Sequence, residues 1–279
     1  MNLAAAALLW RAEGRPAVVV EVVAHQGSVP REAGTRMLVS AREVLGTIGG
    51  GHLELKAIEQ ARALLAGEPA AREQHWPLGP ALGQCCGGAV TLRYTPLADS
   101  DPAAWPRAEP RFVLQLYGAG HVGRAIVKLL EGIDCRVQWI DERESEFPAA
   151  PGAAHVERLC VEPVEAEVRS APPGAFYLVL THSHDLDLRI TEAILRRGDF
   201  GFCGLIGSAT KRARFLRRFE ARGIAPEAVA RLSCPIGVPG IAGKEPEVIA
   251  VAVVAQLLQQ EAQSPAAATT RSRPADFAA

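Results

Sequence analysis

FVLQLYGAGHVGRAIVKLLEGIDCRVQWID, residues 112–141, is the stretch that decides the fold of this chain. It runs from a mostly apolar strand through three glycines in G-x-G-x-x-G spacing into an amphipathic helix, and then into a second strand. In a βαβ unit of this kind, Gly118 permits the tight turn, Gly120 lets the backbone approach a phosphate, and Gly123 lets the helix pack closely on the strand. We therefore predict a Rossmann-type domain, which indicates a nucleotide-like ligand but does not decide the reaction.

Two further features of this unit favour an anionic ligand that carries a sugar. The first N–H groups of the predicted helix have no partner within the helix and can bind an anion. Asp141 ends the second strand at the spacing expected for a carboxylate that receives ribose hydroxyls. The same features would suit a nicotinamide-dependent oxidoreductase, although the sequence does not indicate which residues would serve its acid–base chemistry.

Composition excludes several classes of protein. The formal net charge is -1, which argues against binding nucleic acid through bulk charge. The opening residues MNLAAAALLWRAEGRP lack a basic segment before their apolar run, so we predict an amphipathic helix rather than a signal peptide. No apolar run is long enough to span a bilayer, and the chain has six cysteines, four of them scattered singly, which fits a reducing compartment. We expect a cytoplasmic protein without nucleic-acid or membrane partners.

The chain is long enough for two domains, each with its own core. We predict an α/β protein in which a smaller N-terminal α+β domain covers residues 1–96. A stiff proline-rich linker follows over 97–110, and a Rossmann-type domain with a parallel sheet covers 111–261. The tail, 262–279, lacks a core-forming pattern and is expected to be disordered.

Apolar periodicity and Gly/Pro punctuation locate the remaining elements. In the first domain we predict an initial helix, strands over 17–24, 36–39, 44–48, 72–76 and 89–94, and a helix over 52–66. In the second domain, beyond the glycine-rich unit, we predict strands near 155 and over 176–181 and 202–206, with helices over 163–170, 185–197, 208–222 and 245–260.

A pair of adjacent cysteines, Cys85 and Cys86, lies between Gln84 and two glycines. The pair lacks the C-x-x-C spacing of a zinc knuckle, and the chain has no second pair to complete a four-cysteine site. Two interpretations remain: small buried residues in a tight turn, or thiolates that act as soft ligands or nucleophiles. The flanking glycines favour the second, because they would give a large ligand access to both sulfur atoms.

Two glycine-rich segments of the first domain suit an anion. Gly49, Gly50 and Gly51 precede a predicted helix and would form a backbone anion site, or simply a strand-to-helix turn. Arg31 and Arg36 lie in a loop with several glycines and suit a phosphate or carboxylate. These two segments and the cysteine pair suggest one shared pocket.

Histidines follow a predicted strand of the second domain. His182 and His184 resemble a metallo-hydrolase H-x-H-x-D-H motif only superficially, because Leu186 and Asp187 occupy the positions of its aspartate and last histidine. We predict that they line the crevice outside the carboxyl ends of the strands, or are bonded to a backbone carbonyl. The basic helix over 208–222 is either a solvated face or a surface for an acidic partner.

A succession of motifs resembles the XdhC/CoxF family of xanthine dehydrogenase accessory proteins, over about residues 10–260. The motifs are GSVPREAGTRMLV (27–39), GTIGGGHLE (46–54), GQCCGG (83–88), LYGAGHVG (116–123), LTHSHDLD (180–187), LIGSATKR (205–212) and CPIGVPGIAGKEPEVIAVAV (234–253). The resemblance implies a carrier in purine catabolism rather than an enzyme. Such proteins bind the molybdenum cofactor, protect it while a cysteine desulfurase supports its sulfuration, and deliver it to apo xanthine dehydrogenase. Carriers of this kind often self-associate, so a homodimer is expected.

The resemblance also implies roles for the candidate residues. Cys85 and Cys86 would lie near the molybdenum or its dithiolene, and Gly49 to Gly51 would supply backbone donors. The turn from Gly118 to Gly123 would hold either the cofactor phosphate or a nucleotide. A regulator that uses the fold only as a scaffold for interactions is the remaining alternative.

Overall fold

A computed structural model describes residues 3–78, 88–106 and 110–264 of the chain. The chain divides into two compact units, Met1–Arg107 and Ala108–Ala279, which we call the first and second units. Cys85 and Cys86 lie outside the described residues. Among the helices described, none is both long enough and apolar enough to cross a membrane.

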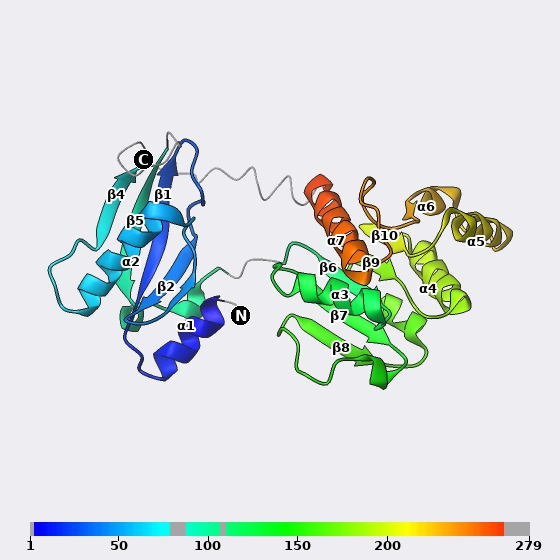
Figure 1. Cartoon of the computed structure of the whole chain (residues 1–279), viewed down its shortest axis with the longest axis horizontal. Helices are drawn as coiled ribbons and strands as arrows, with labels where there is room; N and C mark the ends of the chain where they lie inside the picture. Colours follow the sequence, from blue (N-terminus) through cyan, green and yellow to red (C-terminus); the bar gives the residue numbers. More distant parts are fainter. Residues whose placement is uncertain (1–2, 79–87, 107–109, 265–279) are drawn as a thin grey trace. The chain divides into compact units, whose positions relative to one another are not determined.

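The first unit contains an antiparallel sheet with strand order β3-β2-β1-β5-β4 (Figure 1). Its strands are β1 (Ala17–Gln26), β2 (Arg36–Ser40), β3 (Val44–Gly46), β4 (Glu73–Pro77) and β5 (Ala89–Pro96). Each predicted strand of this domain is therefore present, with its ends shifted by a few residues.

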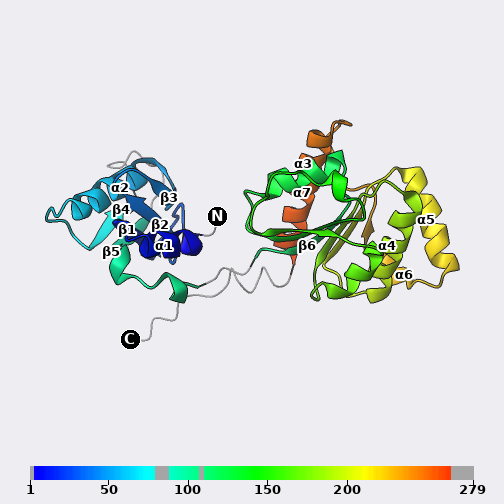
Figure 2. The same ribbon diagram turned by 90° about the horizontal axis from the view of Figure 1, so that it is seen from below.

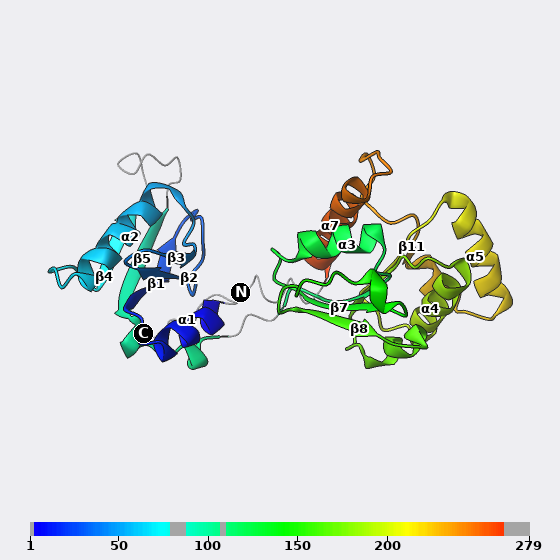
Figure 3. The ribbon, with the colours of Figure 1, turned by 60° about the horizontal axis from the view of Figure 1, so that its bottom comes forward.

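Helices cover both faces of this sheet, which explains why β1 is apolar almost throughout. Helix α1 (Leu3–Ala12) and helix α2 (Gly51–Leu65) lie on opposite sides of the strands (Figure 3). Val18 and Val20 pack in one cluster with residues of α2, whereas Ala17 and Val19 pack in another with Trp10 of α1. Successive side chains of a strand point to opposite faces, so a continuous apolar run is what a sheet buried on both faces requires.

Part of the predicted linker packs on the first unit. Short 3₁₀ helices form at Leu97–Asp99 (η2) and Pro102–Ala104 (η3). The side chain of Leu97 is buried in the cluster that contains Trp10, and Trp105 packs against the same cluster. The prolines indicated a stiff segment, but stiffness does not prevent Leu97 and Trp105 from burying apolar surface against α1.

The second unit contains a parallel sheet with strand order β11-β10-β9-β6-β7-β8. Its strands are β6 (Val113–Tyr117), β7 (Arg136–Asp141), β8 (Val156–Cys160), β9 (Phe176–Val179), β10 (Phe202–Leu205) and β11 (Leu232–Ser233). Read from β8, this is the 3-2-1-4-5-6 order of a Rossmann fold, and the order reverses between β6 and β9. The predicted fold class is confirmed.

Helices of the second unit lie on both faces of its sheet (Figure 2). Helices α3 (His121–Leu130) and α7 (Pro246–Gln263) cover one face and share a core that includes Ile126 and Val253. The other face is covered by the 3₁₀ helix η5 (Val164–Ser170) and by α4 (His184–Arg197), α5 (Ala209–Ala221) and α6 (Pro226–Ala230), whose core includes Phe215.

Some details of the second unit go beyond the prediction. The helix predicted over 163–170 is a 3₁₀ helix, and neither α6 nor β11 was predicted. Both unpredicted elements are too short to show a periodic pattern. Helix α7 continues to Gln263, into the segment predicted to be disordered, and residues 265–279 of that tail lie outside the described part of the chain.

Candidate functional site

The three glycines of the turn after β6 differ in what surrounds them. Gly118 has a φ of 120°, and a Cβ there would lie within 3.0 Å of the carbonyl oxygen of Leu180. A Cβ at Gly123 would collide in the same way with the carbonyl oxygen of Gly118. Gly120 has a φ of -68°, and a Cβ there would meet no heavy atom of the described chain within 4 Å. The chain itself therefore requires glycine at 118 and 123, whereas the space above Gly120 is open to a ligand.

Hydrogen bonds hold the carbonyl groups of this turn. Trp139 Nε1 donates to the carbonyl oxygen of Gly118 at 3.0 Å, and Arg124 Nε donates to that of Ala119 at 3.0 Å. Helix α3 begins directly after Gly120 and has no side-chain cap. The turn is thus fixed by side chains of the chain itself, and the start of α3 has the backbone donors that an anion site needs, so anion binding there stays a prediction.

Asp141 is bonded to the chain rather than free for a ribose. Its Oδ2 accepts a hydrogen bond from the N–H of Ala119 at 2.7 Å and another from Arg143 Nη2 at 3.0 Å. Its Oδ1 accepts from the N–H and from Nε of Arg143, at 2.9 and 3.0 Å. Burial opposes the charged carboxylate, but the hydrogen bonds from Arg143 and Ala119 outweigh burial and hold the pKa of Asp141 below its usual value. Binding a ribose at Asp141 would require Arg143 to move.

The two predicted histidines have different neighbours. His182 lies at the carboxyl ends of the strands, in a small depression lined also by Tyr117, Asp141 and Thr181, with Nε2 3.5 Å from Oε1 of Glu142. Nδ1 of His184 instead accepts a hydrogen bond from Arg214 Nη2 of α5 at 2.8 Å. Only His182 lines the predicted crevice, and the described residues contain no group of three His, Cys, Asp or Glu that could hold a metal ion.

A buried ion pair that sequence reasoning missed lies beside this crevice. Lys211 Nζ is 2.5 Å from Oδ2 of Asp187 and donates to the carbonyl oxygen of Ile206 at 2.8 Å. Oδ1 of Asp187 accepts from the N–H and the hydroxyl of Thr181, at 3.0 and 2.7 Å. The pair therefore ties the loop after β9 to the loop after β10.

Helical spacing could have revealed this pair. Lys211 precedes the buried Phe215 by four residues, and Asp187 precedes the buried Thr191 by four. Residues four apart share one helix face, so both charged residues belong to inward faces. The basic helix is accordingly not uniformly solvated: its Lys211 is 8 % exposed, whereas the side chains of Arg212 and Arg217 form no hydrogen bond or ion pair with the described residues.

In the first unit, the predicted anion-binding turn encloses a carboxylate of the chain itself. Gly49, Gly50 and Gly51 all have positive φ values, of 121°, 75° and 66°. The backbone N–H groups of Ile48 and Gly50 donate to Oε2 of Glu54, at 3.0 and 3.1 Å. The geometry suits an anion, and any external anion would have to replace Glu54 there. The role of the three glycines toward a ligand stays a prediction.

The loop with Arg31 adjoins both other candidate segments of this unit. A Cβ at Gly49 would lie within 3.0 Å of Pro30, and one at Gly88 would lie equally close to the carbonyl oxygen of Ser28. Gly88 is the first described residue after the cysteine pair, and its carbonyl oxygen accepts from the N–H of Leu78 at 2.7 Å. The loop with Arg31 therefore lies beside the three-glycine turn and beside Gly88, where the described part of the chain resumes after the cysteine pair.

The two arginines of this loop differ in their partners. Arg31 is exposed and forms no hydrogen bond or ion pair with any described residue. Arg36 pairs with Glu21 and stacks over the ring of Trp105. Of the two, Arg31 is the guanidinium that has no partner among the described residues, and it suits an anion.

Most cysteines that the structure describes are structural. Cys135, Cys203 and Cys234 are buried, and burial raises the pKa of Cys135 to about 11 and that of Cys203 to about 12. Thiols with such pKa values stay protonated and unreactive near neutral pH. Cys160 alone among the described cysteines is exposed, so thiolate chemistry elsewhere in the chain would depend on Cys85 and Cys86.

This combination, a Rossmann unit with an open glycine turn and an α+β unit with clustered glycine-rich loops, defines a two-unit α/β protein. Residues 114–257 match the family described as XdhC Rossmann domain, and residues 10–75 match the XdhC and CoxI family. The chain belongs to the XdhC family, as its motifs predicted.

Known proteins support the same relationship. The chain is 32% identical to the uncharacterized protein YqeB of Escherichia coli (strain K12), with 95% of this chain and 47% of YqeB covered. The chain thus spans about half the length of that relative. A crystal structure from Bacillus halodurans, described as a xanthine dehydrogenase, superposes with a TM-score of 0.70 at 20% identity and covers 95% of this chain and 98% of that one. This similarity shows a shared fold.

Proposed function

We propose that this protein is an accessory protein of xanthine dehydrogenase that carries the molybdenum cofactor. It binds the cofactor, holds it while a cysteine desulfurase supports its sulfuration, and inserts it into apo xanthine dehydrogenase. The observation that carries this proposal is the match of both parts of the chain to the XdhC family. As a carrier, the protein performs no net turnover.

The chemistry of the cargo suits the candidate residues. The cofactor carries a phosphate, a pterin and a dithiolene that holds molybdenum. The uncapped start of α3 beside Gly120 suits the phosphate. Arg31, whose side chain has no partner among the described residues, suits another anionic group. The thiolates of Cys85 and Cys86 are soft ligands of the kind that suit molybdenum or its sulfur neighbours.

The geometry of Asp141 weighs against the alternative of a nicotinamide-dependent oxidoreductase. Both carboxylate oxygens already accept hydrogen bonds from Ala119 and Arg143. A dinucleotide that used this carboxylate for its ribose would have to break those bonds. We therefore assign the turn from Gly118 to Gly123 to the phosphate of the cargo.

Cofactor content of purified protein tests the proposal. The protein is produced in cells that make the cofactor and are supplied with molybdate. Pterin is measured by fluorescence after oxidation, and molybdenum by mass spectrometry. We expect both in the wild type, and a large loss in Cys85→Ser and Cys86→Ser. Cys160→Ser is the matched control, because Cys160 is exposed but belongs to the other unit.

Two results would contradict the proposal. Wild-type protein that contains neither pterin nor molybdenum, and takes up neither when offered, is not a carrier. If both cysteine variants retained full cofactor content, the role of the thiols would be refuted, but the carrier function would not. Loaded protein should also activate apo xanthine dehydrogenase, and light scattering of the purified protein tests the proposed homodimer.

A further inference from the structure

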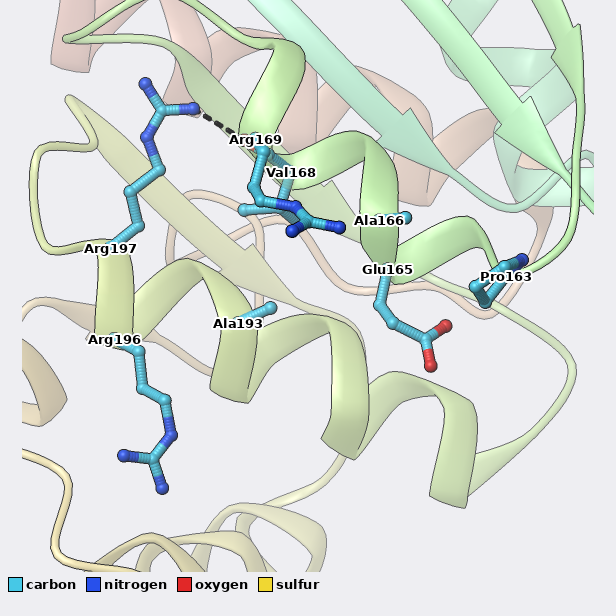
Figure 4. A pocket seen from close by; sticks show the side chains of 8 residues that line it. All are labelled: Pro163, Glu165, Ala166, Val168, Arg169, Ala193, Arg196 and Arg197. Carbon is cyan, nitrogen blue, oxygen red and sulfur yellow. Dashed lines mark hydrogen bonds between the residues drawn. The ribbon is translucent and has the colours of Figure 1, made fainter.

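A groove of about 570 Å³ lies between η5 and α4 of the second unit, apart from the strand-end crevice (Figure 4). Val164 of η5 belongs to the depression beside His182, whereas its neighbours Pro163 and Glu165 line the groove. The remaining lining residues are Ala166, Val168, Arg169, Ala193, Arg196 and Arg197. A space of this size can enclose a small organic ligand.

Glu165 offers this groove an acceptor that the chain does not use. Its Oε1 accepts a hydrogen bond from Arg189 Nε at 2.9 Å, but its Oε2 is buried and has no hydrogen-bond partner among the described residues. A buried carboxylate oxygen without a donor is unfavourable, so such atoms normally have a partner. In Figure 4 the carboxylate points into the space between η5 and α4. A ligand with an N–H group would supply the missing donor.

Arg169 offers the groove a cation without a counter-charge. It is exposed and forms no hydrogen bond or ion pair with the described part of the chain. The neighbouring Arg196 pairs with Glu192 and Arg197 pairs with Asp199, so their charges are already compensated. The guanidinium of Arg169 therefore suits an anionic group such as a phosphate, which it can bind in bidentate fashion.

The surface between these two groups is apolar and made of small side chains. Ala166 and Ala193 face the groove from η5 and α4, with Val168 beside them (Figure 4). Small side chains leave room for a planar ring to lie against the surface. Glu165 and Arg169 are four residues apart, which corresponds to about 8 Å along a 3₁₀ helix. A base edge and its 5′-phosphate are separated by a comparable length.

We propose that this groove binds a nucleoside monophosphate. An N–H group of the base donates to Oε2 of Glu165, the ring lies against Ala166 and Ala193, and the phosphate binds Arg169. This site is separate from the turn at Gly120 and goes beyond the proposed carrier function, so neither assignment depends on the other.

Titration of the full chain with AMP, GMP, CMP and UMP tests the proposal. Binding is followed by calorimetry and by the methyl resonances of Ala166 and Ala193. We expect at least one nucleotide to bind and shift both resonances. Each variant removes a charged side chain that forms hydrogen bonds with the nucleotide. Glu165→Ala and Arg169→Ala should therefore each weaken binding by about tenfold or more.

Matched controls distinguish the loss of a contact with the nucleotide from a general loss of folding or of an ion pair. Arg189→Ala breaks the same ion pair as Glu165→Ala but leaves the acceptor in place, so binding should persist. Arg169 is exposed, so its variant should fold normally. Inorganic phosphate carries only the group that Arg169 would bind, and the free nucleosides carry only the base that Glu165 would bind. Each should bind about tenfold more weakly than the nucleotide.

Three outcomes would overturn the proposal. The first is that none of the four nucleotides binds at millimolar concentration. The second is that Gly120→Val abolishes binding while the variants of Glu165 and Arg169 do not, which places the nucleotide at the Rossmann turn. The third is that inorganic phosphate binds as tightly as the nucleotides, which reduces the site to a simple anion site.

Discussion

Lys211 and Asp187 form an ion pair that is almost completely buried, with 2.5 Å between Nζ and Oδ2. Asp187 lies in the first turn of α4 and Lys211 in the first turn of α5, and they bond to the loops that leave β9 and β10, respectively. A buried ion pair rarely adds net stability over an apolar pair, because both charges lose water. Its effect here is to fix the relative position of two strand-end loops at the edge where ligands of parallel sheets bind.

Replacing Lys211 should destabilise the second unit strongly. Lys211→Met leaves the carboxylate of Asp187 buried without its cation, which typically costs about 3 to 5 kcal/mol. Calorimetric unfolding measures the loss. Arg212→Met is the control, since Arg212 is the next residue and its side chain forms no hydrogen bond or ion pair with the described residues, and it should change stability by less than about 0.5 kcal/mol. Equal effects of the two variants would show that the pair is not important for the fold.

The addition of a methyl group should destabilise the protein much more at Gly118 than at Gly120. Gly118→Ala places a Cβ against the carbonyl oxygen of Leu180 at a φ of 120°, so we expect a loss of more than about 2 kcal/mol. Gly120→Ala meets open space and should lower stability by less than about 1 kcal/mol. Thermal unfolding of the two variants provides the comparison.

Ligand content separates structure from binding at this turn. If the cargo phosphate approaches Gly120, Gly120→Val should reduce the pterin content of the folded protein. A Gly120→Val protein that unfolds like the wild type and retains its pterin would show that the turn has no ligand role.

Local patterns predicted most of the fold. Apolar runs and Gly/Pro punctuation located β1 to β10, and the glycine spacing predicted the turn after β6, because both follow from local sequence pattern and backbone sterics. The partners of charged side chains were not predictable in the same way. Lys211 and Asp187 are 24 residues apart, and their contact depends on how α4 and α5 pack. The sequence shows a carboxylate at 141 and at 54, but only the folded geometry shows that each bonds to its own turn.

The sequence therefore predicted where the candidate site lies better than it predicted the contacts of the residues in it. His182 lines the strand-end crevice, as strand-end position predicts, whereas His184 contacts Arg214 because it begins α4 and faces α5. Cys85 and Cys86 lie outside the described residues, so their role stays a prediction.

The stability that Asp141 contributes should depend on pH. Its folded-state pKa is lowered, because hydrogen bonds from Arg143 and Ala119 outweigh the opposing effect of burial. A carboxyl group with a lowered folded pKa contributes fully above its unfolded pKa of about 4, and the contribution is lost as the pH falls through the folded pKa. Asp141→Asn should therefore lower the free energy of unfolding by about 2 kcal/mol at neutral pH.

The difference between wild type and Asp141→Asn should narrow below about pH 4, where the carboxyl of Asp141 begins to protonate in the unfolded chain, and should vanish as the pH falls through the lower folded pKa. Calorimetric unfolding at several pH values measures this difference in the free energy of unfolding. Asp134→Asn is the control, because Asp134 is exposed and its side chain forms no hydrogen bond within the described residues, and its effect should be small at every pH. A difference for Asp141→Asn that stays constant from neutral to acidic pH would contradict the assigned hydrogen bonds.

Glu54 should act as a built-in competitor for anions in the first unit. Glu54→Ala removes the carboxylate that binds the N–H groups of Ile48 and Gly50, which should lower stability by about 1 to 3 kcal/mol. The freed donors then form an empty anion site. Inorganic phosphate should raise the unfolding temperature of the variant more than that of the wild type, because only the variant offers this site. Glu59→Ala is the control on the same helix, since Glu59 pairs only with Lys56 at the surface. A variant that phosphate stabilises no more than the wild type would show that the glycine turn binds its own carboxylate for structural reasons alone.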